Sequence, residues 1–281
     1  MSFVEWWQHI PSTLDPVIFH LGRFPIRWYG TMYLVAFGTV YLLMNLRIKR
    51  DGLKHDQDFY ADAIMWAIIG VILGGRLGYV LFYNLGDFLA EPWKILSPIA
   101  KVRGQWRFTG ISGMSYHGGV IGVIVGWWWY ARKKQTGFFE LTDAIIPAVP
   151  LGYTFGRLGN FINGELYGRV TESWIGMYWP TARDGLLRHP SQLYEAFFEG
   201  IVLFAILWAL RNRRFFPGFI SGLYVFGYGF VRFFIEYFRE PDEHLGTILL
   251  GLSTGQLLCI GMWVGAGVIW YTGVRLVKVN S

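Results

Sequence analysis

The sequence predicts an all-α integral membrane protein in which residues 1–281 form a single domain. Composition is the first reason: only 16% of the residues are charged, 53% are hydrophobic and 19% are aromatic, whereas soluble proteins carry about 25% charged residues. The second reason is that apolar stretches near the ~20 residues needed to cross a ~30 Å hydrocarbon core recur along the chain. These two features exclude a disordered chain and a soluble domain of ordinary composition.

Seven apolar segments are expected to cross the membrane, although the third and fourth are short and several carry ionisable residues. Residues 1–27 are expected to form an N-terminal arm on the outer surface, with Trp6 and Trp7 at the level of the lipid headgroups. Long outer loops are expected at 84–115 and 157–190. The seven segments lie at 28–46, 61–83, 116–131, 141–155, 193–210, 218–238 and 247–274.

Short basic clusters predict the orientation, because Lys and Arg in short loops favour the cytoplasmic side. The clusters follow segments one, three, five and seven, so all of them lie on the same side of a seven-helix bundle. This places the N-terminus outside and the C-terminus in the cytoplasm. The same placement, at the ends of apolar stretches, argues against nucleic acid as the partner of a chain with a net charge of +6. The cluster residues are Arg47, Lys49, Arg50 and Lys54; Arg132, Lys133 and Lys134; Arg211, Arg213 and Arg214; and Arg275 and Lys278.

A first candidate site opens the third segment, where His117 stands before Gly118 and Gly119. Adjacent glycines allow another chain or a ligand to approach the backbone closely. A histidine at the outer membrane boundary can exchange a proton near neutral pH.

A second candidate site is the stretch 156–169, in which four glycines and two asparagines fall within thirteen residues after Pro147 and Pro150. Such a composition predicts an irregular, non-helical segment. Irregular backbone is excluded from contact with lipid, because its N–H and C=O groups would be unsatisfied. We therefore expect it to line a cavity in the outer half of the membrane, with Arg157 positioned to bind an anionic headgroup.

The fifth and sixth segments supply polar partners. Gln192, Glu195 and Glu199 share one helix face by their spacing, so the two carboxylates need a cation or a proton. In the sixth segment, Tyr228, Arg232 and Glu236 recur every four residues, and Arg232 either pairs with Glu236 or binds a ligand.

Several common chemistries have no motif here. The sequence lacks a His-Glu-x-x-His pattern, a Cys pair, a Gly-x-Ser-x-Gly elbow and a P-loop. We therefore expect no metal and no cofactor. Because the one cysteine, Cys259, lies in an apolar segment, a thiol nucleophile would have to come from the substrate.

Six motifs resemble those of the prolipoprotein diacylglyceryl transferase family, and the resemblance spans the whole chain. The motifs are RWYG at 27–30, GGRLGY at 74–79, YHGGVIG at 116–122, GRLGNFINGELYGR at 156–169, RHPSQLYE at 188–195 and GYGFVRFFIEYFR at 227–239.

The resemblance implies a transferase of the bacterial inner membrane. Enzymes of this family move the diacylglyceryl group of phosphatidylglycerol to the thiol of the lipobox cysteine in a preprolipoprotein signal peptide. The reaction forms a thioether and releases glycerol 1-phosphate, as the first step of lipoprotein maturation. The partners are then phosphatidylglycerol, the signal peptide and the lipid bilayer, and the active site lies toward the periplasmic half of the membrane.

The residue chemistry fits this reaction. A thiol with a pKa near 8.5 needs a base, and either His117 or His189 can take its proton. Arg157 and Arg232 can stabilise the charge that grows on the phosphate oxygens. The remaining candidates hydrogen-bond the headgroup or orient the arginines; they are Tyr29, Asn160, Asn163 and Tyr228 for the first role, and Glu165, Glu195 and Glu236 for the second.

Two other functions use similar residues. A transporter for an anionic lipid or ion would also use an intramembrane Arg and broken helices, but it would need access from both sides of the membrane. A hydrolase of the phospholipase type would need a side-chain nucleophile, for which the sequence has no motif.

Overall fold

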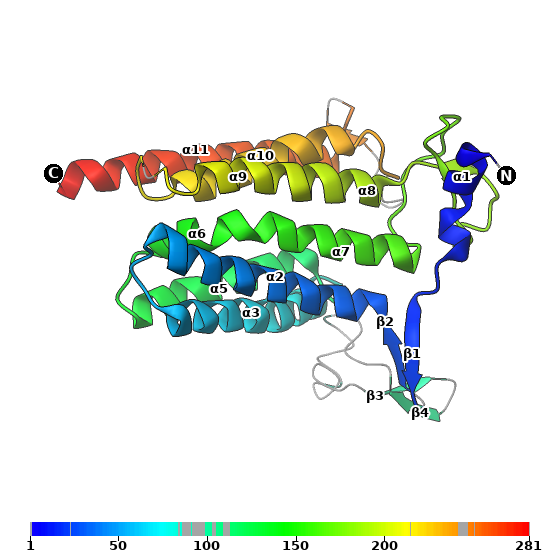
Figure 1. Cartoon of the computed structure of the whole chain (residues 1–281), viewed down its shortest axis with the longest axis horizontal. Coiled ribbons are helices and arrows are strands. Elements are labelled where there is room, and N and C mark those ends of the chain that lie inside the picture. The colour runs from blue at the N-terminus through cyan, green and yellow to red at the C-terminus, as the bar shows by residue number, and fades with distance from the viewer. Residues whose placement is uncertain are drawn as a thin grey trace. The chain divides into compact units, whose positions relative to one another are not determined.

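The computed structural model describes residues 2–22, 24–83, 85, 91, 99–102, 105–108, 113–213, 215–240, 247–249 and 251–280. The chain divides into two compact units (Figure 1). Unit 1 comprises Met1–Leu53 and Thr142–Ser281, and unit 2 comprises Lys54–Leu141. Most of the expected outer loop 84–115, and Arg214 of the third basic cluster, lie outside the described residues.

Four helices of the described part are long and apolar enough to cross a membrane, and this confirms a mostly helical membrane protein. They are Trp28–Asp51, Gln57–Phe82, Ser191–Leu210 and Thr254–Val279. Helices also occupy the other three predicted segments, but they fall short by length or hydropathy; Phe219–Ile235 is one of these. Seven crossings and their orientation therefore stay predictions.

Unit 2 is built on two helices that approach each other through glycines. Helix α3 (Gln57–Tyr83) and helix α5 (Tyr116–Lys133) present glycines four residues apart to one another. A Cβ atom added to Gly74 or Gly122 would overlap a carbonyl oxygen of the facing helix, and one added to Gly78 would lie 2.8 Å from the Cα atom of Gly118. Small residues at this spacing let membrane helices pack backbone to backbone. The close approach expected at Gly118 is thus made by α3. Unit 2 also contains the antiparallel hairpin of β3 (Ile99–Val102) and β4 (Gln105–Phe108).

Unit 1 holds the remaining elements, and most of its helices run along a common direction (Figure 1). The first are α1 (Phe3–Thr13), β1 (Val17–Leu21), β2 (Phe24–Arg27) and α2 (Trp28–Asp51). Helix α6 (Phe138–Ile145) begins in unit 2 and ends in unit 1, where η2 (Ile146–Ala148) and α7 (Val149–Asn163) follow. The rest are β5 (Met177–Tyr178), β6 (Leu187–Arg188), α8 (Ser191–Glu195), the π-helix η3 (Ala196–Val202), α9 (Leu203–Leu210), α10 (Phe219–Ile235), β7 (Thr247–Leu249), β8 (Leu252–Ser253) and α11 (Thr254–Asn280).

The mostly helical structure is consistent with the predicted all-α class, and short antiparallel strand pairs occur outside the long helices. In the described part these are β1 with β2, β3 with β4, β5 with β6, and β7 with β8. The physical reason is that backbone N–H and C=O groups of a connecting segment also need partners, and a hairpin supplies them locally.

The prediction of a non-helical segment at 156–163 is wrong. These residues continue helix α7, which ends at Gly164 in the left-handed conformation (φ 67°). A helix satisfies every backbone group internally, so it needs no wet cavity. The glycines serve packing instead: a Cβ added to Gly152 would lie 3.2 Å from a backbone carbonyl oxygen of α2, and one added to Gly159 would lie 3.4 Å from a ring carbon in α2.

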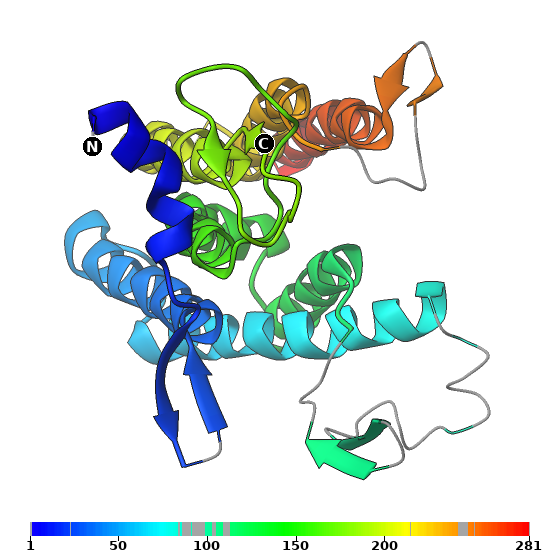
Figure 2. The same ribbon diagram turned by 90° about the vertical axis from the view of Figure 1, so that its right-hand side faces the viewer.

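The N-terminal arm is a helix and a hairpin, and part of it packs into unit 1. Trp7 joins an apolar cluster around Phe161, Met177 and Trp179, and its indole N–H donates to the carbonyl of Ile175 at 3.0 Å. Helix α1 therefore lies against the loop that carries β5 and β6 (Figure 2). The sequence expectation treated Trp6 and Trp7 alike, but only Trp6 is exposed (49%).

Two of the predicted cytoplasmic arginines are held in an ion-pair group rather than solvated. Arg47 is 1% exposed and its Nε lies 3.0 Å from Oδ2 of Asp51. Arg211 contacts the same carboxylate at 2.9 Å. This group of ion pairs joins the end of α2 to the end of α9.

Candidate active site

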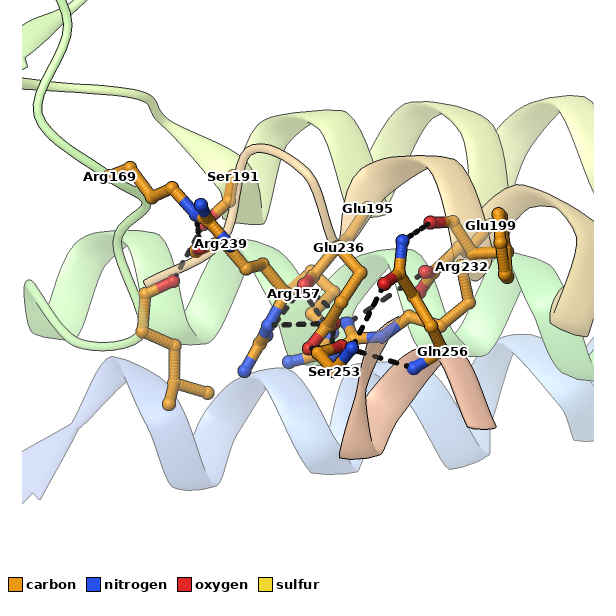
Figure 3. A network of polar contacts seen from close by, with 12 residues as sticks. Arg157, Arg169, Ser191, Glu195, Glu199, Arg232, Glu236, Arg239, Ser253 and Gln256 are labelled. Carbon is orange, nitrogen blue, oxygen red and sulfur yellow. Dashed lines mark hydrogen bonds and ion pairs between the residues drawn. The ribbon is translucent and has the colours of Figure 1, made fainter. Parts of the chain in front are cut away.

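The most charged interior of unit 1 is a group of three arginines and three glutamates, here called the arginine–glutamate cluster (Figure 3). It comes from α7, α8, η3, α10 and the turn after α10. Its members are Arg157, Glu195, Glu199, Arg232, Glu236 and Arg239.

Glu195 is the centre of the cluster. Its fully buried carboxylate meets three guanidinium groups. Oε2 lies 2.9 Å from Nε of Arg157, while Oε1 lies 2.7 Å from Nη1 of Arg232 and 2.7 Å from Nη1 of Arg239. A buried carboxylate is stable only when cations and hydrogen bonds replace the water that it loses. Glu195 therefore fixes the positions of three cations at once.

Glu199 adds a second buried carboxylate one turn further along. Its Oε2 accepts the hydroxyl hydrogen of Tyr153, and its Oε1 lies 3.9 Å from Nη1 of Arg232. The Tyr153 hydroxyl in turn accepts from Nε of Arg157 at 2.6 Å. Glu199 belongs to the π-helical turn η3, and π-turns are frequent at functional sites. We expected at least one of these two carboxylates to be paired or protonated, and both lie beside Nη1 of Arg232.

Glu236 closes the cluster on the side of α11. Its Oε2 lies 3.1 Å from Nη2 of Arg232, and its Oε1 accepts from the Ser253 hydroxyl at 3.3 Å. The pairing of Arg232 with Glu236 expected from their spacing is therefore present. Arg232 is not simply neutralised by it, because Glu195 binds the same guanidinium.

A second polar row extends from Arg157 along the end of α7. Nη1 of Arg157 donates to Asn160 Oδ1 at 3.4 Å, and Asn160 Nδ2 donates to Glu165 Oε1 at 2.8 Å. Tyr29, at the start of α2, interacts with Asn160 and shares a 3.1 Å contact between hydroxyl oxygens with Tyr33. Four predicted site residues thus form one connected row.

Three loop segments, 168–170, 188–189 and 238–239, pair through their backbones and are here called the loop seam. The Gly168 N–H donates to the His189 carbonyl at 2.8 Å, and the Arg169 N–H donates to the Phe238 carbonyl at 2.9 Å. A Cβ atom at Gly168 would overlap that Phe238 oxygen, so the seam needs glycine there. The seam holds Arg239 beside Glu195.

The two histidines occupy different settings. His189 belongs to the loop seam; its Nδ1 lies 3.0 Å from the Tyr194 hydroxyl, and burial lowers the pKa of its imidazole. His117 lies in unit 2, exposed in the first turn of α5, which the Ser115 side chain caps by accepting from the Gly118 N–H at 3.2 Å.

Two other predicted residues lie on α10 and at the end of α7. Tyr228 is buried on α10, with its ring edge toward Tyr153 at 5.8 Å between centroids. Asn163 is the last residue of α7, and within the described part of the chain its side chain makes no hydrogen bond.

Sequence reasoning missed Arg239, Tyr153 and a role for Glu199 in the site. A usable signal existed for two of them, because Tyr153 precedes Arg157 by one helical turn and Arg239 follows Glu236 by three residues. Arg239 nevertheless depends on the loop seam, and no local pattern reports that pairing.

The cluster can bind an anion. Its three guanidinium groups are held by carboxylates rather than by water, so their positions are preorganised. Each arginine side chain keeps 14–16% of its surface accessible, while Glu195 and Glu199 have none. Glu236 is 11% exposed, so the arginines are the most accessible charged groups of the cluster by a small margin. No group of three metal-ligating side chains occurs among the described residues.

Comparison with known proteins decides the family. The family model for prolipoprotein diacylglyceryl transferase matches residues 16–272. The chain belongs to this family. A phosphatidylglycerol–prolipoprotein diacylglyceryl transferase of Chlorobaculum tepidum is 57% identical, over 95% of this chain and 92% of the relative. Proteins of the same name from Pseudoalteromonas atlantica (44% identical, 95% and 91% covered) and Bordetella bronchiseptica (47% identical, 92% and 95% covered) are also similar. The matched range covers both units and contains every residue of the arginine–glutamate cluster.

Proposed function

We propose that this protein is a transferase that moves the diacylglyceryl group of phosphatidylglycerol to the lipobox cysteine thiol of a preprolipoprotein. The product is a thioether, the by-product is glycerol 1-phosphate, and the reaction is the first step of lipoprotein maturation. The observation that carries the proposal is the arginine–glutamate cluster, a preorganised anion site among apolar helices, in a chain of this family.

Arg157 is the principal phosphate ligand in this proposal. Its Nε is anchored between Tyr153 and Glu195 and its Nη1 donates to Asn160, which leaves Nη2 to face a ligand. Arg232 supplies a second positive charge to the same anion. As the carbon–oxygen bond of the glyceryl group breaks, charge grows on the phosphate oxygens, and fixed guanidinium groups stabilise it without losing their own protons.

The other site residues bind or orient. Asn160 and Tyr29 adjoin Arg157 and present amide and hydroxyl groups to the headgroup. Asn163 and Tyr228 are assigned to the same headgroup. Glu165 orients Asn160, while Glu195 and Glu236 orient the arginines.

The attacking thiol needs a base, and His117 is assigned to this step. It is exposed on α5, so its imidazole is free to meet a peptide substrate. His189 is the alternative base. Its lowered pKa keeps it neutral, but its Nδ1 is engaged with Tyr194 and its backbone with the loop seam. Neither role involves a metal or cofactor.

The proposed location is the bacterial inner membrane, with seven crossings and the site toward the periplasmic half. The four basic clusters support this orientation. A reporter fused after Ser281 is expected to behave as cytoplasmic; a reporter that behaves as periplasmic would invert the topology and move the site to the other half.

The deciding experiment is incubation of the purified protein with phosphatidylglycerol and a lipobox peptide, followed by mass spectrometry. The peptide should gain the mass of one diacylglyceryl group on its cysteine. A matched peptide with Ser in place of that cysteine is the control and should gain none. If the lipid instead disappears without any peptide product, the protein is a hydrolase; if the lipid is only moved between vesicles, it is a transporter.

A further inference from the structure

The three arginines of the cluster differ in which nitrogens remain available to a ligand. Arg232 has both terminal nitrogens on carboxylates: Nη1 on Glu195 at 2.7 Å and Nη2 on Glu236 at 3.1 Å. A phosphate would have to displace one of these carboxylates to reach the fork. In the state that the structure describes, Arg232 is committed to internal partners.

Arg157 and Arg239 are different. Arg157 uses Nε for Tyr153 and Glu195 and Nη1 for Asn160, and Arg239 uses Nη1 for Glu195. For each of these two arginines, Nη2 makes no hydrogen bond to the residues that the structure describes. Their side chains are 14% and 15% exposed, so neither fork is sealed off.

The carboxylate of Glu195 also sets the spacing of these two arginines. Arg157 binds Oε2 and Arg239 binds Oε1, so they flank the same small anion from its two oxygens (Figure 3). A phosphodiester likewise presents two charged oxygens on one atom. Guanidinium forks match such an anion geometrically, whereas an isolated ammonium does not.

Arg239 is held in place by the backbone as well as by its side chain. The backbone of Arg239 forms a β-bridge with Gly168 in the loop seam. The Arg239 carbonyl oxygen also accepts a hydrogen bond from Nε of Arg169 at 2.7 Å. Nε of Arg239 is buried without a hydrogen bond and lies 3.7 Å from Glu236. The backbone pairing therefore fixes the position of this guanidinium group before any ligand binds.

We propose that Arg239 is a direct ligand of the lipid phosphate and forms, with Arg157, the clamp that holds it. This rests on the proposed function. Arg232 then acts through its charge and by holding three carboxylates in place. In the reaction, the thiolate sulfur forms a bond to the terminal glyceryl carbon and the bond from that carbon to oxygen breaks. Its electron pair stays on the phosphate oxygen, between the two guanidinium groups, and the thiol proton passes to the base.

Phosphorothioate analogues of phosphatidylglycerol test a direct contact. In these lipids sulfur replaces one of the two non-bridging phosphate oxygens, which gives two diastereomers. Sulfur accepts hydrogen bonds from a guanidinium poorly, so the wild-type enzyme is expected to use one diastereomer at least 10-fold more slowly than the other. Arg239→Lys should lower kcat/KM for natural phosphatidylglycerol about 10²-fold, as loss of one transition-state donor does, and should bring the diastereomer ratio toward one. The KM for the peptide should stay unchanged.

Controls separate binding from folding. Arg239→Gln and Arg239→Lys should keep the wild-type melting temperature within a few degrees, because Glu195 retains Arg157 and Arg232. The exposed Arg213→Gln removes the same charge elsewhere and should leave rate and ratio unchanged.

Three results would overturn the assignment of Arg239. The first is an Arg239→Lys enzyme that turns over at the wild-type rate. The second is an Arg239→Lys enzyme that is slower but keeps the wild-type diastereomer ratio. The third is a wild-type enzyme that uses the two phosphorothioate diastereomers at equal rates. In each case the proposed function would still hold, provided that the wild-type protein lipidates the peptide. Absence of any lipidated peptide with natural phosphatidylglycerol would instead refute the proposed function itself.

Discussion

Glu195→Gln is the substitution to which the arginine–glutamate cluster should be most sensitive. The glutamate receives three guanidinium groups on two oxygens at 2.7–2.9 Å while it has no exposed surface. Glutamine has nearly the same shape, but one of its two terminal groups is an NH₂. If its oxygen stays with Arg232 and Arg239, its NH₂ faces Nε of Arg157, and two donors then oppose each other.

The expected loss of stability follows from this geometry. Removing one partner of a buried ion pair costs about 3–5 kcal/mol, because the remaining charge stays buried without compensation. In this cluster three cations would share two carboxylates, Glu199 and Glu236, whose ion pairs within the described residues are with Arg232 and Arg239 and not with Arg157. Arg157 would lose its only ion pair within the described residues. We therefore expect both a large fall in stability and a loss of at least 10²-fold in rate.

Thermal unfolding in detergent, measured beside peptide lipidation, is the assay. Glu165→Gln is the matched control for stability: among the described residues that carboxylate accepts one hydrogen bond, from Asn160 Nδ2 at 2.8 Å, and a glutamine oxygen can accept the same bond. Glu165→Gln should therefore unfold near the wild-type temperature. A Glu195→Gln protein that unfolds as late as Glu165→Gln and lipidates at the wild-type rate would refute the assignment of Glu195 as the centre of the cluster.

Three further outcomes are expected. Arg157→Lys keeps the charge but loses the planar fork, and Arg157→Ala loses both, so lipidation should fall on the order of 10²-fold or more; near-normal turnover by folded Arg157→Ala would remove it as the phosphate ligand. His117→Gln should slow turnover at neutral pH and recover in part toward about pH 8.5, where the thiolate forms unaided; the same rescue in His189→Gln instead would reverse the two roles. Gly168→Ala should abolish activity, because its Cβ would overlap the Phe238 carbonyl oxygen. Gly156→Ala should fold at least as well as wild type, because a Cβ at this helical position has no atom within 4 Å. If both variants kept activity equally, the loop seam would not be needed.

Sequence reasoning was most successful where the relevant contact is local. The shared face of Glu195 and Glu199 and the pairing of Arg232 with Glu236 follow from helical spacing, and the structure confirms them. Arg157 was predicted on an irregular segment, but it lies on helix α7, where Glu195 binds it.

Prediction from local patterns failed in the glycine-rich stretch of α7, because a high glycine content has two structural meanings. Glycine breaks helices in water, but it also allows two membrane helices to touch. Gly159 does the second, so α7 continues through a stretch expected to be irregular. Arg239 was missed for a different reason: it reaches Glu195, 44 residues away, through the loop seam, and pairing between distant segments leaves no periodic signal in either one.

In the proposed reaction the thiol attacks the glyceryl carbon while the arginines hold the departing phosphate. Phosphatidylglycerol that carries oxygen-18 at the bridge between this carbon and phosphorus distinguishes this reaction from attack at phosphorus. All of the label should leave in glycerol 1-phosphate, and the lipidated peptide should carry none. Label found on diacylglycerol, with no thioether formed, would show attack at phosphorus and refute the proposed reaction.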